Sequence, residues 1–117
     1  MLRGAIVGFG RMGMTHHAIV NTHPDVELAA VCDSSDVMLK NLKRFTKVEV
    51  FTDVRKMLAE VKLDFIIICT PTSSHAELGM IAIENGLHIF MEKPFALTAE
   101  EGQRMADAAE KLSLIHI

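Results

Sequence analysis

A glycine-rich turn near the start of the chain restricts the possible folds more than any other feature. Gly8, Gly10 and Gly13 form a G-x-G-x-x-G pattern directly after the apolar run Ala5–Val7 and at the start of an amphipathic stretch, residues 12–22. Glycine permits a tight turn out of a strand and lets the next helix pack close to that strand. The pattern therefore predicts a strand, a turn and a helix, the first unit of a parallel α/β fold.

The rest of the chain continues the alternation of short apolar runs and longer amphipathic stretches. Four further strands are predicted: Glu27–Cys32, Val48–Phe51, Asp64–Cys69 and His88–Met91. The helices predicted between and after them are residues 36–44, residues 53–61, a helix from Ser74 to Asn85, and a helix from Thr98 onward. Strands that alternate with helices in this way form a parallel sheet with right-handed crossovers.

Several residues have the chemistry of helix N-caps. Ser34 and Ser35 precede the helix at 36–44, while Ser74 and Thr98 each stand three residues before a glutamate, in the S/T-x-x-E form of a capping box. We therefore expect the hydroxyls of Ser74 and Thr98 to accept hydrogen bonds from backbone N–H groups in the first turns of their helices.

Composition excludes several classes of protein. The chain has 117 residues with a formal net charge of −3, which argues against a nucleic-acid-binding surface. Its longest apolar run, residues 65–69, is far shorter than the ~20 residues of a membrane-spanning helix. Cys32 and Cys69 both lie in apolar runs and are expected to be buried thiols in a reducing compartment, so a cytoplasmic location is predicted.

The glycine turn and an acidic residue after the second predicted strand together predict a dinucleotide site. Gly10 has no Cβ, so a diphosphate can approach the backbone, where the helix N-terminus offers free N–H groups. Asp33 lies 20 residues after Gly13, where its carboxylate can accept hydrogen bonds from the adenosine ribose hydroxyls. The carboxylate would repel a 2′-phosphate, and Ser34 offers no positive charge, so NAD is favoured over NADP.

Polar residues also follow the fourth and fifth predicted strands, whose carboxyl ends lie at the ligand-binding edge of such a sheet. The first group begins Thr70-Pro71-Thr72 and ends at His75; the second is Glu92-Lys93-Pro94. Next to a cationic nicotinamide ring, the ammonium form of Lys93 would be disfavoured, which suits a general acid or base. The alternatives are helix capping for the serines of the first group and a solvated ion pair for Glu92 and Lys93. His16 and His17 point in different directions on a helix, so no metal site is predicted.

In this order, these motifs resemble the N-terminal half of the Gfo/Idh/MocA oxidoreductases. The residues that carry the resemblance are Gly8–Gly13 with His16 and His17, Val31–Asp33, Thr70–His75 and Glu92–Pro94. The resemblance implies a Rossmann doubly wound sheet with strand order 3-2-1-4-5, followed in the family by a sixth strand. It also implies NAD(P)-dependent oxidation of a secondary alcohol on a sugar or polyol. A further α/β domain would supply the substrate residues and the homo-oligomer contacts.

The resemblance also implies roles for individual residues. Lys93 would be the catalytic lysine near the nicotinamide, with a cis bond to Pro94. It implies cofactor contacts by Phe9, Arg11, Met12, Thr70, His75 and Glu92. Over the four motifs, the predicted cofactor-binding residues are Gly8, Phe9, Gly10, Arg11, Met12, Gly13, Asp33, Ser34, Thr70, Pro71, Thr72, His75, Glu92, Lys93 and Pro94. The family often carries Asn where this chain has Thr72. The alternative to an enzyme is a dinucleotide-binding module without catalysis, or an inert fragment.

The last six residues, Leu112–Ile117, have two interpretations. The bases CTG TCT CTT ATA CAC ATC would translate to these six residues, and that base sequence resembles a transposon end used as a sequencing adapter. On that interpretation, residues 1–111 are an incomplete dinucleotide-binding domain and residues 112–117 are a non-native tail. The other interpretation is that these residues begin a sixth strand. The lack of a glycine or other turn residue after the preceding helix argues against it.

Overall fold

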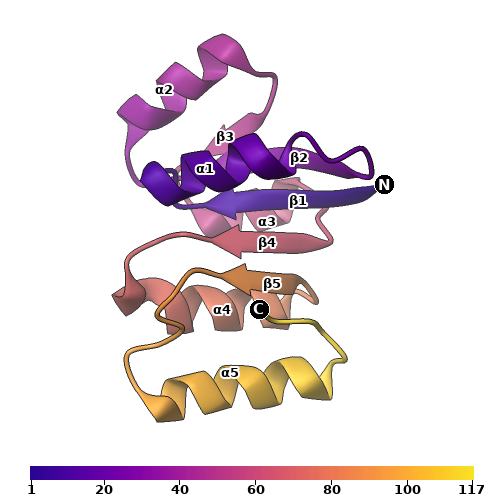
Figure 1. The fold of residues 1–117 in the computed structure, drawn as a ribbon, viewed down its shortest axis with the longest axis vertical. Coiled ribbons are helices and arrows are strands. Elements are labelled where there is room, and N and C mark those ends of the chain that lie inside the picture. Colours follow the sequence, from indigo (N-terminus) through magenta and orange to yellow (C-terminus); the bar gives the residue numbers. More distant parts are fainter.

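The computed structural model describes residues 1–117, which form a five-stranded parallel sheet with strand order β3-β2-β1-β4-β5 (Figure 1). This confirms the predicted fold. The strands are β1 (Leu2–Val7), β2 (Val26–Cys32), β3 (Glu49–Phe51), β4 (Phe65–Ile68) and β5 (His88–Met91). The helices are α1 (Arg11–Val20), α2 (Asp36–Phe45), α3 (Val54–Glu60), α4 (His75–Glu84) and α5 (Ala99–Lys111), with a 3-10 turn at Thr72–Ser74.

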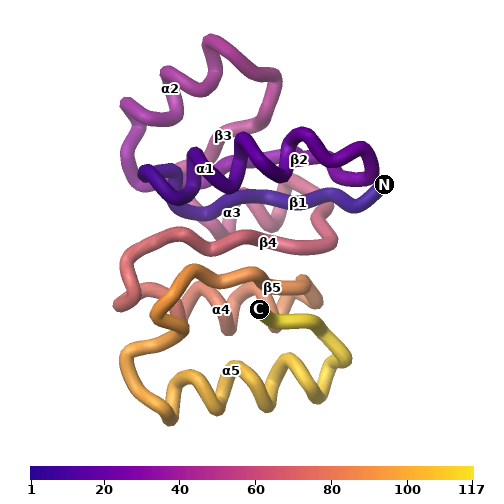
Figure 2. The backbone as a smooth tube through the Cα atoms, in the orientation of Figure 1, coloured from indigo at the N-terminus to yellow at the C-terminus, as the bar shows by residue number.

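Each strand contributes apolar side chains to both faces of the sheet. In β1, Ala5 and Val7 belong to a core with Met57 of α3 and Ile83 of α4, whereas Ile6 belongs to a second core that includes Leu39 and Leu42 of α2. Helix α5 completes the first core by packing against α4, and Figure 2 shows its place at the β5 end of the molecule. Strands covered on both faces explain the continuous apolar runs in the sequence.

The central strand β1 aligns the carboxyl ends of its two neighbours. Val7 is in register with Cys32 of β2 and with Ile68 of β4, and a register shift between Gly4 and Ala5 lets β1 follow β2 along its whole length. The residues that follow each strand therefore meet at a single edge of the sheet.

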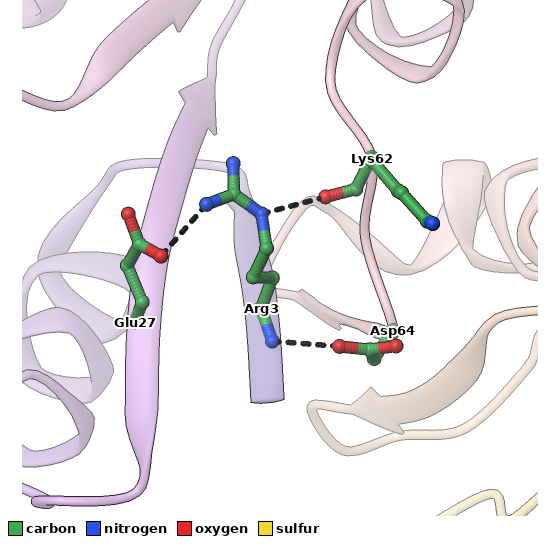
Figure 3. A network of polar contacts seen from close by, with 4 residues as sticks. All are labelled: Arg3, Glu27, Lys62 and Asp64. Carbon is green, nitrogen blue, oxygen red and sulfur yellow. Dashed lines mark hydrogen bonds and ion pairs between the residues drawn. The ribbon is translucent and has the colours of Figure 1, made fainter. Parts of the chain in front are cut away.

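Arg3 links three segments at the opposite edge of the sheet (Figure 3). Its guanidinium donates to Glu27 Oε2 at 2.7 Å and to the Lys62 carbonyl at 3.0 Å, while its backbone N–H donates to Asp64 Oδ2 at 2.8 Å. The Arg3 and Glu27 side chains are 40% and 48% exposed, so this ion pair contributes about 1 kcal/mol at most. The network therefore holds together the starts of β1, β2 and β4, at the opposite end of the strands from their carboxyl ends.

The predicted helix caps are only partly confirmed. Thr98 Oγ1 accepts from the Glu101 N–H at 3.2 Å, as expected, but the Glu101 carboxylate accepts from Leu97 instead of completing the box. The capping prediction for Ser74 is wrong, because its hydroxyl donates back to Thr70 Oγ1 and the Pro71 carbonyl. Ser35 likewise makes no side-chain cap, and its backbone N–H donates to Asp33. For Ser74, acceptors in the loop after β4 therefore take the hydrogen bond of the hydroxyl.

The C-terminal residues lie beside β5, in the position of a sixth strand. The Ile89 N–H donates to the Ile115 carbonyl at 2.8 Å, the Ile117 N–H donates to the Ile89 carbonyl at 2.9 Å, and Ile89 and His116 form a parallel bridge. Ser113, with φ 55°, makes the turn after α5 for which the sequence offered no glycine. None of the helices has the length and apolar character needed to cross a membrane.

Candidate dinucleotide site

The glycine turn packs tightly between two strands and a helix. Gly8 has φ 92°, a conformation that favours glycine, and a Cβ there would lie 2.7 Å from the Cys69 carbonyl carbon. A Cβ on Gly13 would collide with the Gly8 carbonyl oxygen. Gly10 differs, because nothing lies within 4 Å of the position its Cβ would take. Two of the glycines therefore allow close packing, and the middle one leaves an open approach to the backbone.

Asp33 fixes the glycine turn to the end of β2. Its Oδ2 accepts from the Phe9 N–H, and its Oδ1 accepts from the Ser35 N–H at 2.7 Å. A carboxylate has about four lone-pair sites, so these two bonds leave each oxygen able to accept from a ligand hydroxyl. Asp33 thus holds the turn and keeps acceptor capacity for a ribose.

The carboxyl ends of β1, β2 and β4 enclose a cleft of about 530 Å³. Six of the predicted residues line it: Gly8, Gly10, Asp33, Ser34, Thr70 and Pro71. A second hollow of about 550 Å³ lies between α2 and β3, but none of the predicted residues lines it. The cleft at the strand ends is therefore the candidate site.

Other lining residues of this cleft were not predicted. Cys32 and Cys69 lie on either side of Gly8, and burial raises the pKa of both thiols to about 11, so they stay neutral near pH 7. Thr52 and Val54 come from the loop after β3 and the start of α3. Thr52 could have been expected from its place after the third predicted strand, whereas the thiols looked like plain core residues.

The remaining residues of the glycine turn lie around the cleft without lining it. Phe9 is buried, with its ring packed edge-on against His17 at 5.6 Å between centroids, and burial lowers the pKa of His17. Arg11 and Met12 are exposed in the first turn of α1, and Gly13 is buried beneath that turn. Thr72 is half-buried in the 3-10 turn before α4.

The Glu92-Lys93-Pro94 segment follows β5 on the same edge of the sheet. Glu92 Oε1 lies 3.0 Å from His16 Nε2 of α1, so this carboxylate is paired with a helix instead of with its neighbour Lys93. The bond between Lys93 and Pro94 is cis, as the resemblance implied. Lys93 is exposed and lines a separate hollow of about 340 Å³ with Phe95 and the C-terminal residues.

His75, for which the resemblance implies a cofactor contact, lies close to two backbone carbonyls in this structure. Its side chain is 1% exposed at the start of α4. Its Nδ1 lies 2.9 Å from the Pro94 carbonyl oxygen, and its Nε2 lies 2.8 Å from the Thr70 carbonyl oxygen. Both ring nitrogens therefore face backbone carbonyls, and a neutral ring, which carries hydrogen on one nitrogen only, can donate to just one of them.

The cleft fits a dinucleotide by its shape and by its donor set. Gly10 caps α1 without a side-chain hydrogen bond, which leaves the N–H groups of the first turn for a diphosphate. The open space at Gly10 admits that group, and the Asp33 carboxylate faces the same cleft as a ribose acceptor. These features are the parts of an NAD site that sequence alone predicted.

Known proteins resemble almost the whole of this chain. Residues 2–117 match the family described as oxidoreductase family, NAD-binding Rossmann fold (GFO_IDH_MocA). The chain belongs to the Gfo/Idh/MocA family. One Gfo/Idh/MocA relative is the D-glucoside 3-dehydrogenase of Escherichia coli K12, 37% identical over 116 residues, which cover 97% of this chain and 33% of the relative. The NAD(+)-dependent scyllo-inositol 2-dehydrogenase of Bacillus subtilis 168 is 32% identical and is covered to 34%.

Solved Gfo/Idh/MocA structures have the same fold as this chain. The scyllo-inositol dehydrogenase of Lactobacillus casei with bound NAD(H) and scyllo-inositol superposes with a TM-score of 0.92 at 27% identity, covering 100% of this chain and 35% of that one. The myo-inositol 2-dehydrogenase of Lactobacillus plantarum gives 0.90 at 34% identity, covering 98% and 35%. The chain thus spans about a third of the length of these relatives.

Proposed function

We propose that these residues form the cofactor-binding part of an NAD-dependent dehydrogenase that oxidises a secondary alcohol on a sugar or polyol. The observation that carries the proposal is the common edge of the sheet, where the glycine turn, Asp33 and Lys93 follow strands β1, β2 and β5. The relatives named above, with glucoside and inositol dehydrogenases among them, support the substrate class.

In the proposed reaction the chain binds and orients the cofactor, and one of its side chains accepts a proton. The N–H groups at the start of α1 bind the diphosphate, and Asp33 accepts from the adenosine ribose. Bound NAD supplies the acceptor for the hydride that leaves the alcohol carbon. The Lys93 amine takes the proton of the substrate hydroxyl as the carbonyl forms. The proposal leaves substrate recognition to residues outside this chain.

Two further parts of the proposal concern the cell and the assembly. The free thiols Cys32 and Cys69 support a reducing, cytoplasmic location. We propose that the contacts of a homo-oligomer are made by the domain of the relatives that this chain does not span.

Replacing Lys93 with alanine in the complete protein tests the proposed function. We expect turnover of polyols with NAD to fall by about 100-fold or more, the range of general acid–base catalysis, while the Kd for NAD stays within a factor of about three. Steady-state kinetics and calorimetry measure the two quantities.

The matched control is Lys62→Ala, which removes a lysine side chain at the opposite edge of the sheet. Only its backbone carbonyl is used by Arg3, so turnover should be unchanged. Lys93→Ala with full turnover would refute the role of this lysine. NAD binding by a wild-type protein that turns over no polyol or sugar would favour the non-catalytic module instead.

A further inference from the structure

His75 connects the cofactor cleft to the turn that carries Lys93. The Thr70 carbonyl belongs to a residue that lines the cleft, and the Pro94 carbonyl belongs to the residue next to Lys93. Both carbonyls lie within hydrogen-bond distance of one ring, although the two residues are 24 positions apart. The first turn of α4 thus joins the ends of β4 and β5.

The bond to Pro94 is the only hydrogen bond that holds this turn. Residues 93–96 make no other hydrogen bond to the rest of the protein, by backbone or side chain. The flanking positions are fixed separately: the Glu92 N–H donates to the Ile68 carbonyl at 2.9 Å, and the Leu97 N–H donates to Glu101. Phe95 packs at the margin of the core, which anchors a side chain without fixing the orientation of the Pro94 carbonyl.

We propose that His75 is a positioning residue for Lys93, whose ring holds the Pro94 carbonyl at a fixed place relative to the cofactor cleft. The proposal rests on the proposed function only in assigning catalysis to Lys93. A carbonyl oxygen can only accept, so Nδ1 must carry hydrogen to hold Pro94. His75 is 1% exposed, so bulk solvent does not reach the ring to replace this donor.

Two substitutions separate the two bonds of the ring. In His75→Asn the amide nitrogen lies near the position of Nδ1 and can still donate to Pro94. In His75→Gln it lies near the position of Nε2, so it can donate to Thr70 but not to Pro94. Both variants lose the aromatic ring, so both should lower the melting temperature to a similar extent, and each is the control for the other.

The expected result is a difference between the two variants at Lys93. In the 117-residue chain, backbone ¹⁵N relaxation should show Lys93 and Phe95 mobile in His75→Gln and ordered in His75→Asn. In the complete protein, kcat should fall by up to about 100-fold in His75→Gln, with the KM for NAD unchanged, because a displacement of about 1 Å at a reacting group can cost that much. His75→Asn should keep most of the wild-type kcat.

Ring ¹⁵N shifts of the wild-type chain provide a test that needs no variant. Hydrogen on Nδ1 is expected, and an Nδ1 that carries none would overturn the proposal, as would equal mobility of Lys93 in the two variants. If His75→Gln loosens Lys93 and kcat is unaffected, the positioning role is also refuted. If the complete wild-type protein shows no turnover, the proposed function fails, while relaxation and ring shifts still decide whether His75 holds the turn.

Discussion

Replacing Gly13 with alanine should destabilise the fold by about 2–3 kcal/mol, because the added Cβ collides with the Gly8 carbonyl oxygen. The sign of the effect is informative. In an ordinary exposed helix the same change stabilises by about 1 kcal/mol, since alanine has the higher helix propensity. Urea unfolding of the two chains measures the difference directly.

The control for this variant is Gly10→Ala. Its Cβ would meet nothing within 4 Å, and φ −77° is accessible to alanine, so the free energy of unfolding should change by no more than about 0.5 kcal/mol. A Gly13→Ala chain as stable as wild type would contradict the close packing of α1 on β1 that brings the helix terminus to the cleft.

Replacing Gly10 with valine should produce the opposite result: intact stability and weak cofactor binding. The branched side chain would occupy the open space through which a diphosphate reaches the N–H groups at the start of α1. Overlap of this kind costs about 2 kcal/mol, which corresponds to a rise of roughly 30-fold in the Kd for NAD.

Thermal melts and NAD titrations of the same preparations separate the two effects. Gly10→Ala should be intermediate in affinity, because it adds one methyl group in place of an isopropyl group. Wild-type affinity for NAD in Gly10→Val would mean that the diphosphate does not bind next to Gly10. The diphosphate site would then lie elsewhere along the carboxyl ends of the strands.

The parts of the fold and site that sequence predicted are those set by local chemistry. Alternating apolar and amphipathic stretches predict a parallel sheet with right-handed crossovers, whereas the strand order was implied by the family resemblance. Gly8, Gly13 and Asp33 are determined by the conformation and spacing of a single βαβ unit, so their places in the structure match the prediction.

The features that sequence did not predict depend on how the loops after the strands fold and on what they contact. The sequence did not predict that the His75 ring lies within hydrogen-bond distance of the Pro94 carbonyl, 19 residues away. Glu92 pairs with His16, 76 residues away, instead of with its neighbour Lys93. Ser74 has the local pattern of a cap, but the Thr70 hydroxyl at 2.6 Å takes its hydrogen bond. Spacing rules describe neighbours along one helix, whereas these contacts depend on the path of the loops that follow β4 and β5.

Calorimetric titration of the 117-residue chain with NAD and, separately, with NADP tests the central claim most directly. A single saturable site for NAD is predicted, with weaker binding of NADP, because the Asp33 carboxylate accepts from a ribose hydroxyl and repels a 2′-phosphate. No binding of either dinucleotide at millimolar concentration, or NADP bound as tightly as NAD, would contradict the account.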